Sequence, residues 1–461
     1  MKSKNDSYWL KSGIFSILQS MSGVFFGFFG FYILVRVLSK HDFGTWSLFM
    51  VTISIVEMIR TGMVQNALIK FLSFSPKEDH SKIIAASFSI NGLLSLVCIV
   101  LNLFFSHYLS RLWSTPDIIP LFYLSNVYIL LSGVLTQFQC IEQANLQFKG
   151  LFIIAVLRQS IFFLFLFICF LIHFNVQLIM LVYIQIFTVL VSTFISYFSV
   201  KKYLSFSFVD HFKWVKNLFN YGKYTFGTSI SVALANSLDT FMLGGMLSAA
   251  SAGAYNIAVR ITNLVDIPTS SVASIVFPQS ALRMKTEGIS AIKYLYEKSV
   301  GIILALLIPS LVLLFIFSGF VIDLIAGTKY QEVLPILKVT ILYCLLIPFG
   351  RQFGTIIDSI GKPKLSFVIV VITASINMGL NYVMITRYGV VGAAYSTLVA
   401  NSIGFIMAQV ILRRLLKVNI LNTFRYALQF YPEFLFKYIL PASVLSDLKK
   451  IKLNGLRILF K

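Results

Sequence analysis

The chain contains a run of 42 residues, from Gln159 to Val200, without a single Lys, Arg, Asp or Glu. One membrane-spanning helix needs about 20 apolar residues, so this run is long enough for two spans. A polar patch at residues 173–177 marks the turn between them. A soluble protein has no reason to make an uncharged helical hairpin of that length. The run therefore indicates an integral membrane protein.

Composition extends this conclusion to the whole chain. Apolar residues make up 58% of the sequence and charged residues 12%, whereas soluble domains carry about 25% charge. The 461 residues leave room for about a dozen spans and no sizeable extramembrane domain. The uncharged stretch from Ser12 to Val35 follows three lysines and is too long for a signal peptide, so we interpret it as the first span.

The same reasoning predicts an all-α polytopic membrane protein with about twelve transmembrane helices. We expect the helices at residues 12–35, 45–68, 83–106, 118–141, 151–172, 178–200, 224–246, 252–276, 299–320, 333–357, 365–386 and 390–412.

The distribution of Lys and Arg predicts the orientation. Of the 38 Lys and Arg residues, 28 fall on the side of the two termini and five on the opposite side. Because cytoplasmic loops carry the excess of basic residues, both termini are expected in the cytoplasm. This bias also accounts for the net charge of +21 without nucleic acid.

The segment from Lys417 onward has apolar residues near helical spacing among its cations, as in basic amphipathic segments that lie on an anionic leaflet. A partly disordered tail and a thirteenth span are the alternatives.

An internal repeat divides the chain in two. Leu38-Ser39 is followed after four residues by Gly44 and then Trp46, and Leu247-Ser248 is followed in the same way by Gly253 and Tyr255, at an offset of 209 residues. Each motif lies between the first two helices of a six-helix set, which predicts two six-helix bundles related by pseudo-two-fold symmetry, a known transporter arrangement. The expected domains are residues 1–200, a basic cytoplasmic linker at 201–223, residues 224–415, and a basic amphipathic cytoplasmic tail at 416–461.

Four landmarks carry a resemblance to a known family. They are the segments 38–44, 64–71 and 388–395, and Asp239 followed by the segment 252–258. In this order and spacing, over about residues 8–415, the chain resembles the bacterial polysaccharide repeat-unit flippases, the O-antigen and capsule translocases of the multidrug/oligosaccharidyl-lipid/polysaccharide exporter superfamily. Members of that family often have 14 spans, where this chain has 12.

The resemblance implies a transporter in the bacterial inner membrane and no enzymatic activity. It would flip polyprenyl-diphosphate-linked oligosaccharides to the outer leaflet by alternating access, for lipopolysaccharide or capsule. H⁺ or Na⁺ as a coupling ion, and glycan polymerase and chain-length proteins as partners, are part of the same expectation.

Charged residues inside the predicted spans are the candidate site, because each costs roughly 2.5–3.5 kcal/mol on insertion scales and usually faces a cavity or a partner. Given the resemblance, the cations would attract the diphosphate, whose oxygens suit guanidinium groups. The candidate substrate-binding residues are Arg60, Arg158, Arg260, Lys338 and Arg351. The candidate coupling or counter-ion residues are Asp239, Glu57, Asp266 and Asp358.

Each candidate also has a purely structural interpretation. Glu57 and Arg60 are three residues apart and form a self-neutralising pair on one helix face, and Arg351 and Asp358 are seven apart on another. Asp266 precedes Ile267-Pro268, where a helix break would free backbone groups for its carboxylate. Arg158 lies near the end of its predicted span, so its side chain could instead extend to the membrane interface with its charged group in water. For Asp239, close to the middle of its span, counter-ion and protonatable coupling site remain equal alternatives.

Two other functions remain open. A drug or cation antiporter of the same superfamily would share the fold but should have an acidic cavity, whereas here cations are as numerous as acids inside the spans. A membrane-embedded glycan polymerase or transferase would need a large outer loop or an acidic catalytic motif. The four cysteines fall within apolar segments and the five histidines in loops or span ends, so we expect no cofactor, no metal site and no catalytic cluster.

Overall fold

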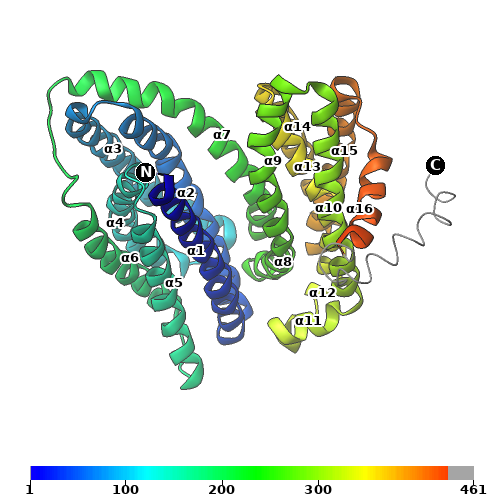
Figure 1. Ribbon diagram of the computed structural model, residues 1–461. Helices are drawn as coiled ribbons and strands as arrows, with labels where there is room; N and C mark the ends of the chain where they lie inside the picture. The colour runs from blue at the N-terminus through cyan, green and yellow to red at the C-terminus, as the bar shows by residue number, and fades with distance from the viewer. Residues whose placement is uncertain (1, 435–461) are drawn as a thin grey trace. The chain divides into compact units, whose positions relative to one another are not determined.

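The computed structural model describes residues 2–434, with their side chains except at positions 2–17, 20, 224, 225, 228, 229, 231, 232, 274, 278, 281, 285 and 434. Every regular element in this range is helical (Figure 1). The long helices are α1 (Lys2–Val37), α2 (Lys40–Phe74), α3 (His80–Trp113), α4 (Ile118–Ala144), α5 (Phe148–Leu171), α6 (Leu178–Val200), α7 (His211–Met246), α8 (Ala249–Thr262), α9 (Asp266–Thr286), α10 (Ile289–Ile316), α12 (Val333–Cys344), α13 (Ile347–Ser359), α14 (Pro363–Tyr388), α15 (Val390–Leu416) and α16 (Ile420–Phe434). The short elements are α11 (Ser318–Ile325), η1 (Lys77–Asp79), η2 (Asn263–Val265) and η3 (Thr328–Tyr330).

All twelve predicted spans fall on helical chain, and the all-α polytopic fold is confirmed. Three predicted spans are interrupted. The ninth, expected at residues 299–320, passes from the end of α10 at Ile316 into α11, which begins at Ser318. The eighth consists of α8 and α9 with η2 between them, so the break lies just before Asp266, where the sequence indicated one. Pro268 lies in the first turn of α9, where its missing N–H leaves no hydrogen bond unmade. The tenth consists of α12 and α13, and this break, just before Pro348, was not predicted.

Within residues 2–434, nine helices are long and apolar enough to cross a membrane. Three predicted spans fall outside that set: α1, α7 and the pair α8–α9. The apolar part of α1, Met21–Val37, is short, and the other two spans carry Asp239, Arg260 and Asp266 among many Ser and Thr residues. Helices of this polarity need protein neighbours instead of lipid around their charged groups.

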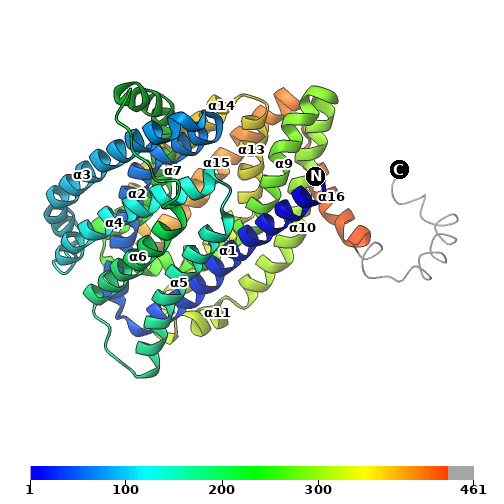
Figure 2. The ribbon, with the colours of Figure 1, turned by 60° about the vertical axis from the view of Figure 1, so that its left-hand side comes forward.

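The chain forms two compact units. Unit 1 comprises the residues through Ile257 together with Ile322–Val333 and Asn381–Ala393, and unit 2 comprises Ala258–Val321, Leu334–Leu380 and the chain from Ala394 onward. Within unit 1, α4 packs on α6 and α5 on both α1 and α6, as Figures 1 and 2 show. The helix α7 packs on α2 and α3. The domain boundaries expected from the sequence stay a prediction.

The first turns of α7 explain why this helix joins unit 1. It begins at His211, well before the expected start of the span at residue 224, so much of the basic segment 201–223 is helical. Trp214 and Leu218, four residues apart on one face, are buried in a core with Ile83 and Val200. The lysines of this segment are exposed on the other face. The part of this segment from His211 onward is thus the amphipathic start of α7. Its charge alone had suggested a linker.

In unit 2, the C-terminal helix α16 is docked on α10. The carboxylate of Glu297, 2% exposed, accepts a hydrogen bond from the backbone N–H of Asn419 at 2.7 Å and one from the Asn422 side chain at 2.9 Å. Further along, the Tyr431 hydroxyl donates to the Ala305 carbonyl at 2.6 Å. The described part of the expected tail therefore packs against the protein. Residues 435–461 lie outside the described residues, and the membrane-surface location of the tail stays a prediction.

The docking of α16 predicts the effect of Glu297→Gln. A glutamine side chain has one acceptor oxygen, whereas Glu297 accepts hydrogen bonds from both Asn419 and Asn422. The variant should therefore stabilise the docked position of α16 less, by about 1–3 kcal/mol. Lys417, exposed between α15 and α16, should then be cut by trypsin at least about tenfold faster in the purified protein. Glu287→Gln is the matched control, since Glu287 is exposed and its ion pair in the described part of the chain is with the nearby Arg283 at 3.7 Å. Equal cleavage of the two variants would contradict the role of Glu297.

Candidate functional site

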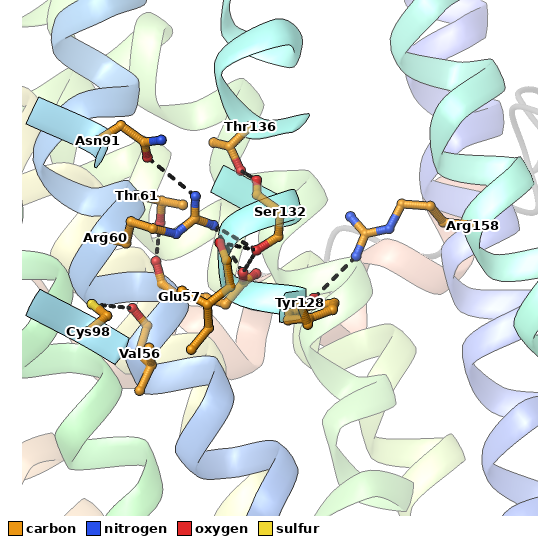
Figure 3. Close-up of polar contacts among 11 residues, drawn as sticks. Val56, Glu57, Arg60, Thr61, Asn91, Cys98, Tyr128, Ser132, Thr136 and Arg158 are labelled. Carbon is orange, nitrogen blue, oxygen red and sulfur yellow. Dashed lines mark hydrogen bonds and ion pairs between the residues drawn. The ribbon is translucent and has the colours of Figure 1, made fainter. Parts of the chain in front are cut away.

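The candidate residues of α2 form a buried network with neutral side chains of α3 and α4 (Figure 3). The Arg60 side chain is fully buried, and its Nη2 donates to Glu57 Oε1 at 3.0 Å and to Ser132 Oγ at 3.2 Å. Its Nη1 donates to Asn91 Oδ1 at 3.3 Å, and the Ser132 hydroxyl donates to Glu57 at 2.7 Å. The guanidinium is thus neutralised and held among three helices, and in this conformation it is not accessible to a substrate.

Arg158 approaches the same side of α4 from α5 (Figure 3). Its Nη2 donates to the Tyr128 hydroxyl at 3.4 Å, and Tyr128 lies one helical turn before Ser132 on the same face of α4. The arginine is half-buried, and a tyrosine hydroxyl does not cancel its charge. Together with the neutralised Glu57–Arg60 pair, Arg158 leaves this part of unit 1 with one positive charge.

Asp239 of α7 accepts hydrogen bonds from two other helices, in each case from a residue that belongs to unit 1. The Tyr255 hydroxyl of α8 donates to its Oδ2 at 2.5 Å, and the Asn381 amide of α14 donates to its Oδ1 at 2.6 Å. The aspartate is 8% exposed. Both of these donors are neutral, and the carboxylate joins three helices at one point.

In unit 2, the structure joins two candidates that the sequence did not pair. Arg351 Nη2 lies 2.5 Å from Asp266 Oδ2, and both side chains are about half exposed. The sequence spacing pointed to Asp358 for Arg351 and to the helix break for Asp266. A second helix supplies the partner because the start of α9 packs beside α13. Asp358 is exposed near the end of α13.

The two remaining cations are exposed within unit 2. Arg260 lies in the last turn of α8. Lys338 of α12 lies with its Nζ 5.7 Å from the centre of the Phe315 ring, a contact that leaves its charge uncompensated.

The neutral partners were not foreseen, because Tyr128, Ser132 and Asn91 are ordinary residues of apolar helices until their neighbours are known. Tyr255 was visible only as the aromatic end of the repeat. Glu142 was missed because it follows the expected end of its span at residue 141. It is fully buried at the end of α4, and neither carboxylate oxygen has a hydrogen-bond partner within the described residues.

Across residues 2–434, no three His, Cys, Asp or Glu side chains are grouped so as to hold a metal ion.

Ionisable side chains held inside a bundle of membrane helices are typical of proteins that move polar substrates across a membrane. The fold agrees with this class. The chain matches the structure of the lipid II flippase MurJ in an inward closed conformation with a TM-score of 0.73 at 17% identity, over 90% of each chain. At this identity the likeness shows the shared fold alone.

The chain belongs to the family of polysaccharide biosynthesis proteins, whose family model matches residues 33–335. It is 23% identical over 390 residues to the lipopolysaccharide biosynthesis protein WzxC of Escherichia coli, covering 82% of this chain and 74% of that protein. It is 26% identical over 196 residues to a probable low-salt glycan biosynthesis flippase of Haloferax volcanii, and here the match spans 42% of each protein. The family resemblance seen in the sequence is thereby confirmed.

The buried network predicts how Glu57→Gln affects stability. Removing the carboxylate leaves Arg60 as an uncompensated buried charge, which should cost about 3 kcal/mol. The double variant Glu57→Gln/Arg60→Met removes both charges and should recover most of this loss. Thermal unfolding of the purified proteins in detergent measures both effects. A double variant no more stable than Glu57→Gln alone would show that the pair is not the source of the stability.

Proposed function

We propose that this protein flips polyprenyl-diphosphate-linked oligosaccharides from the cytoplasmic to the outer leaflet of a bacterial inner membrane, for O-antigen or capsule biosynthesis. The observation that carries the proposal is the pair of intramembrane cations, Arg158 and Lys338, whose hydrogen-bond and cation–π contacts among the described residues involve no carboxylate. Arg60 is matched by Glu57 and Arg351 by Asp266, while the contacts of Arg158 and Lys338 with Tyr128 and Phe315 leave their charges in place.

The chemistry of the substrate matches these positive charges. A lipid-linked oligosaccharide carries a diphosphate beside its sugars, and guanidinium and ammonium groups bind phosphate oxygens strongly in a medium of low dielectric constant. We assign diphosphate binding to Arg158 within unit 1 and, separately, to Lys338 and Arg260 within unit 2. Arg60 and Arg351, already paired, would position neighbouring helices and become available to substrate only if their carboxylates move away.

Asp239 is the group we assign to coupling. It is a buried carboxylate at the junction of α7, α8 and α14, so uptake of a proton or Na⁺ there would change how these helices are joined. Glu57, Asp266 and Asp358 serve as counter-ions in this proposal. The bias of basic residues toward one side supports cytoplasmic termini.

We further infer that the protein moves its substrate unchanged and that catalysis belongs to partner polymerases and transferases. A drug or cation antiporter is the second candidate, because that class shares the superfamily. An organic cation would be repelled by the positive charges of Arg158 and Lys338, so these two residues favour an anionic substrate.

The test is the location of lipid-linked glycan in cells that lack the gene. Spheroplasts would be probed with a lectin that does not cross the membrane. Repeat units that are built but stay on the cytoplasmic leaflet are the expected result. Repeat units displayed normally would favour drug export, and repeat units never built would indicate an enzyme.

The cation assignment predicts the outcome of complementing the same cells with point variants. Arg158→Gln and Lys338→Gln should each lower the rate of display by about tenfold or more, because a hydrogen bond to a charged group contributes about 1.5–3 kcal/mol. Lys213→Gln, which removes an exposed lysine of α7, is the control and should complement fully. Normal display by the first two variants, at equal protein level, would remove these residues from the site.

A further inference from the structure

The two copies of the repeat motif meet in the structure. Gly44, in the first turns of α2, and Gly253, in the first turns of α8, are the equivalent glycines of the two motifs, and both belong to unit 1. A Cβ placed on Gly44 would lie 2.0 Å from the carbonyl oxygen of Ala249, and one placed on Gly253 would lie 2.9 Å from the Gly44 Cα. The two helices therefore touch backbone to backbone, which only glycine at both positions allows.

Charged side chains surround this crossing. Lys40 at the start of α2 forms an ion pair with Glu332 at 2.7 Å. Lys329 donates to the Leu38 carbonyl at 2.8 Å, and Arg36 donates to the Leu324 carbonyl at 2.7 Å. These contacts join the α1–α2 junction to the segment Ile322–Val333, which comes from the second half of the sequence but belongs to unit 1.

Aromatic packing completes the cluster. Tyr330, 1% exposed, packs edge-on against Phe43 with ring centres 6.4 Å apart. The Lys40 and Lys329 ammonium groups lie 5.6 and 5.3 Å from the centre of the Tyr330 ring. We call the set formed by Arg36, Lys40, Gly44, Gly253 and segment 322–333 the outer cluster.

The outer cluster combines attraction with repulsion. Arg36, Lys40 and Lys329 are three of the five cations on the predicted outer side, and Glu332 is the carboxylate that pairs with one of them. Burial, and then the charges of Lys40 and Arg36, lower the pKa of Lys329 below its usual value. The Lys40–Glu332 ion pair is exposed, with 36% and 53% of the two side chains accessible to solvent. An ion pair between exposed side chains contributes at most about 1 kcal/mol to stability. A closure of this strength is suited to repeated opening.

The predicted topology indicates on which side of the membrane the outer cluster lies. The end of α1 and the starts of α2, α8 and α12 all lie on the side opposite the termini, if the chain crosses the membrane twelve times. A transporter that alternates between two openings must separate its helices on this side to release substrate outward.

We propose that the outer cluster is a latch that closes the outer side of the transport path, and that its Lys40–Glu332 ion pair breaks each time the protein opens outward. The proposal rests on the proposed function. The repeat supplies the fixed part of the latch, where two glycines bring α2 and α8 together, and Lys40–Glu332 supplies the reversible part.

Access of a thiol reagent tests the latch without depending on any substrate. Ser47 lies one turn inward from Gly44, is 8% exposed and bonds only its own helix, to the Phe43 carbonyl, among the contacts described here. Ser47→Cys would be labelled from outside with a membrane-impermeant maleimide in intact spheroplasts, and the four native cysteines are all buried. Labelling should be slow in the parent Ser47→Cys protein.

Charge reversal is the decisive comparison. Lys40→Glu and Glu332→Lys should each raise the labelling rate by roughly two- to fivefold, as expected for an exposed ion pair. The swapped double variant should restore the slow rate. Gly44→Ala should raise labelling further, and its monodisperse elution would exclude unfolding as the cause. Unchanged labelling in all variants would overturn the latch. Failure of the double swap to restore the slow rate would also overturn it and indicate an anion-binding role for Lys40.

Crosslinking connects the latch to transport. Lys40→Cys/Glu332→Cys, joined by a short cleavable crosslinker, should stop glycan display until the linker is cleaved. The control His107→Cys/Tyr123→Cys joins two exposed residues across the α3–α4 hairpin and should leave display unchanged. Normal display with the latch crosslinked would overturn the proposal. Absence of any glycan effect in the gene deletion would instead refute the proposed function and leave the labelling result valid.

Discussion

The hydrocarbon core of the bilayer offers no hydrogen-bond partners, so a charged group inside a span is best held by other groups of the chain. The arrangement of helices follows from how that requirement is met. Arg60 draws α3 and α4 around α2 through Asn91, Ser132 and Glu57. Asp239 draws α8 and α14 to α7. In each case one ionised group fixes the positions of two further helices.

This constraint also explains where the sequence was informative. Apolarity and length define a membrane span almost completely, and nine of the twelve predicted spans fall on helices of the described residues that meet both requirements. The break before Asp266 was visible because proline and a charge interrupt an apolar helix. The start of α7 was placed too late, because the lysines of that segment concealed the helical spacing of Trp214 and Leu218.

The partners of the charges were much harder to foresee. Pairs within one helix follow from spacing, and Glu57 with Arg60 was found in this way. Pairs between helices depend on packing that no local pattern records. Arg351 thus pairs with Asp266 on another helix although Asp358 lies two turns away on its own. The repeat is an exception, since its glycines, 209 residues apart, mark two helix starts that lie in contact.

The central claim is that the protein moves a lipid-linked anionic oligosaccharide across a bilayer without altering it. The most direct measurement uses purified protein in vesicles that contain a polyprenyl-diphosphate-linked oligosaccharide in both leaflets, with a glycosidase added outside. We predict that the enzyme digests the substrate of both leaflets when the protein is present and that of the outer leaflet alone in vesicles without it. Digestion confined to the outer leaflet in both samples would contradict the account.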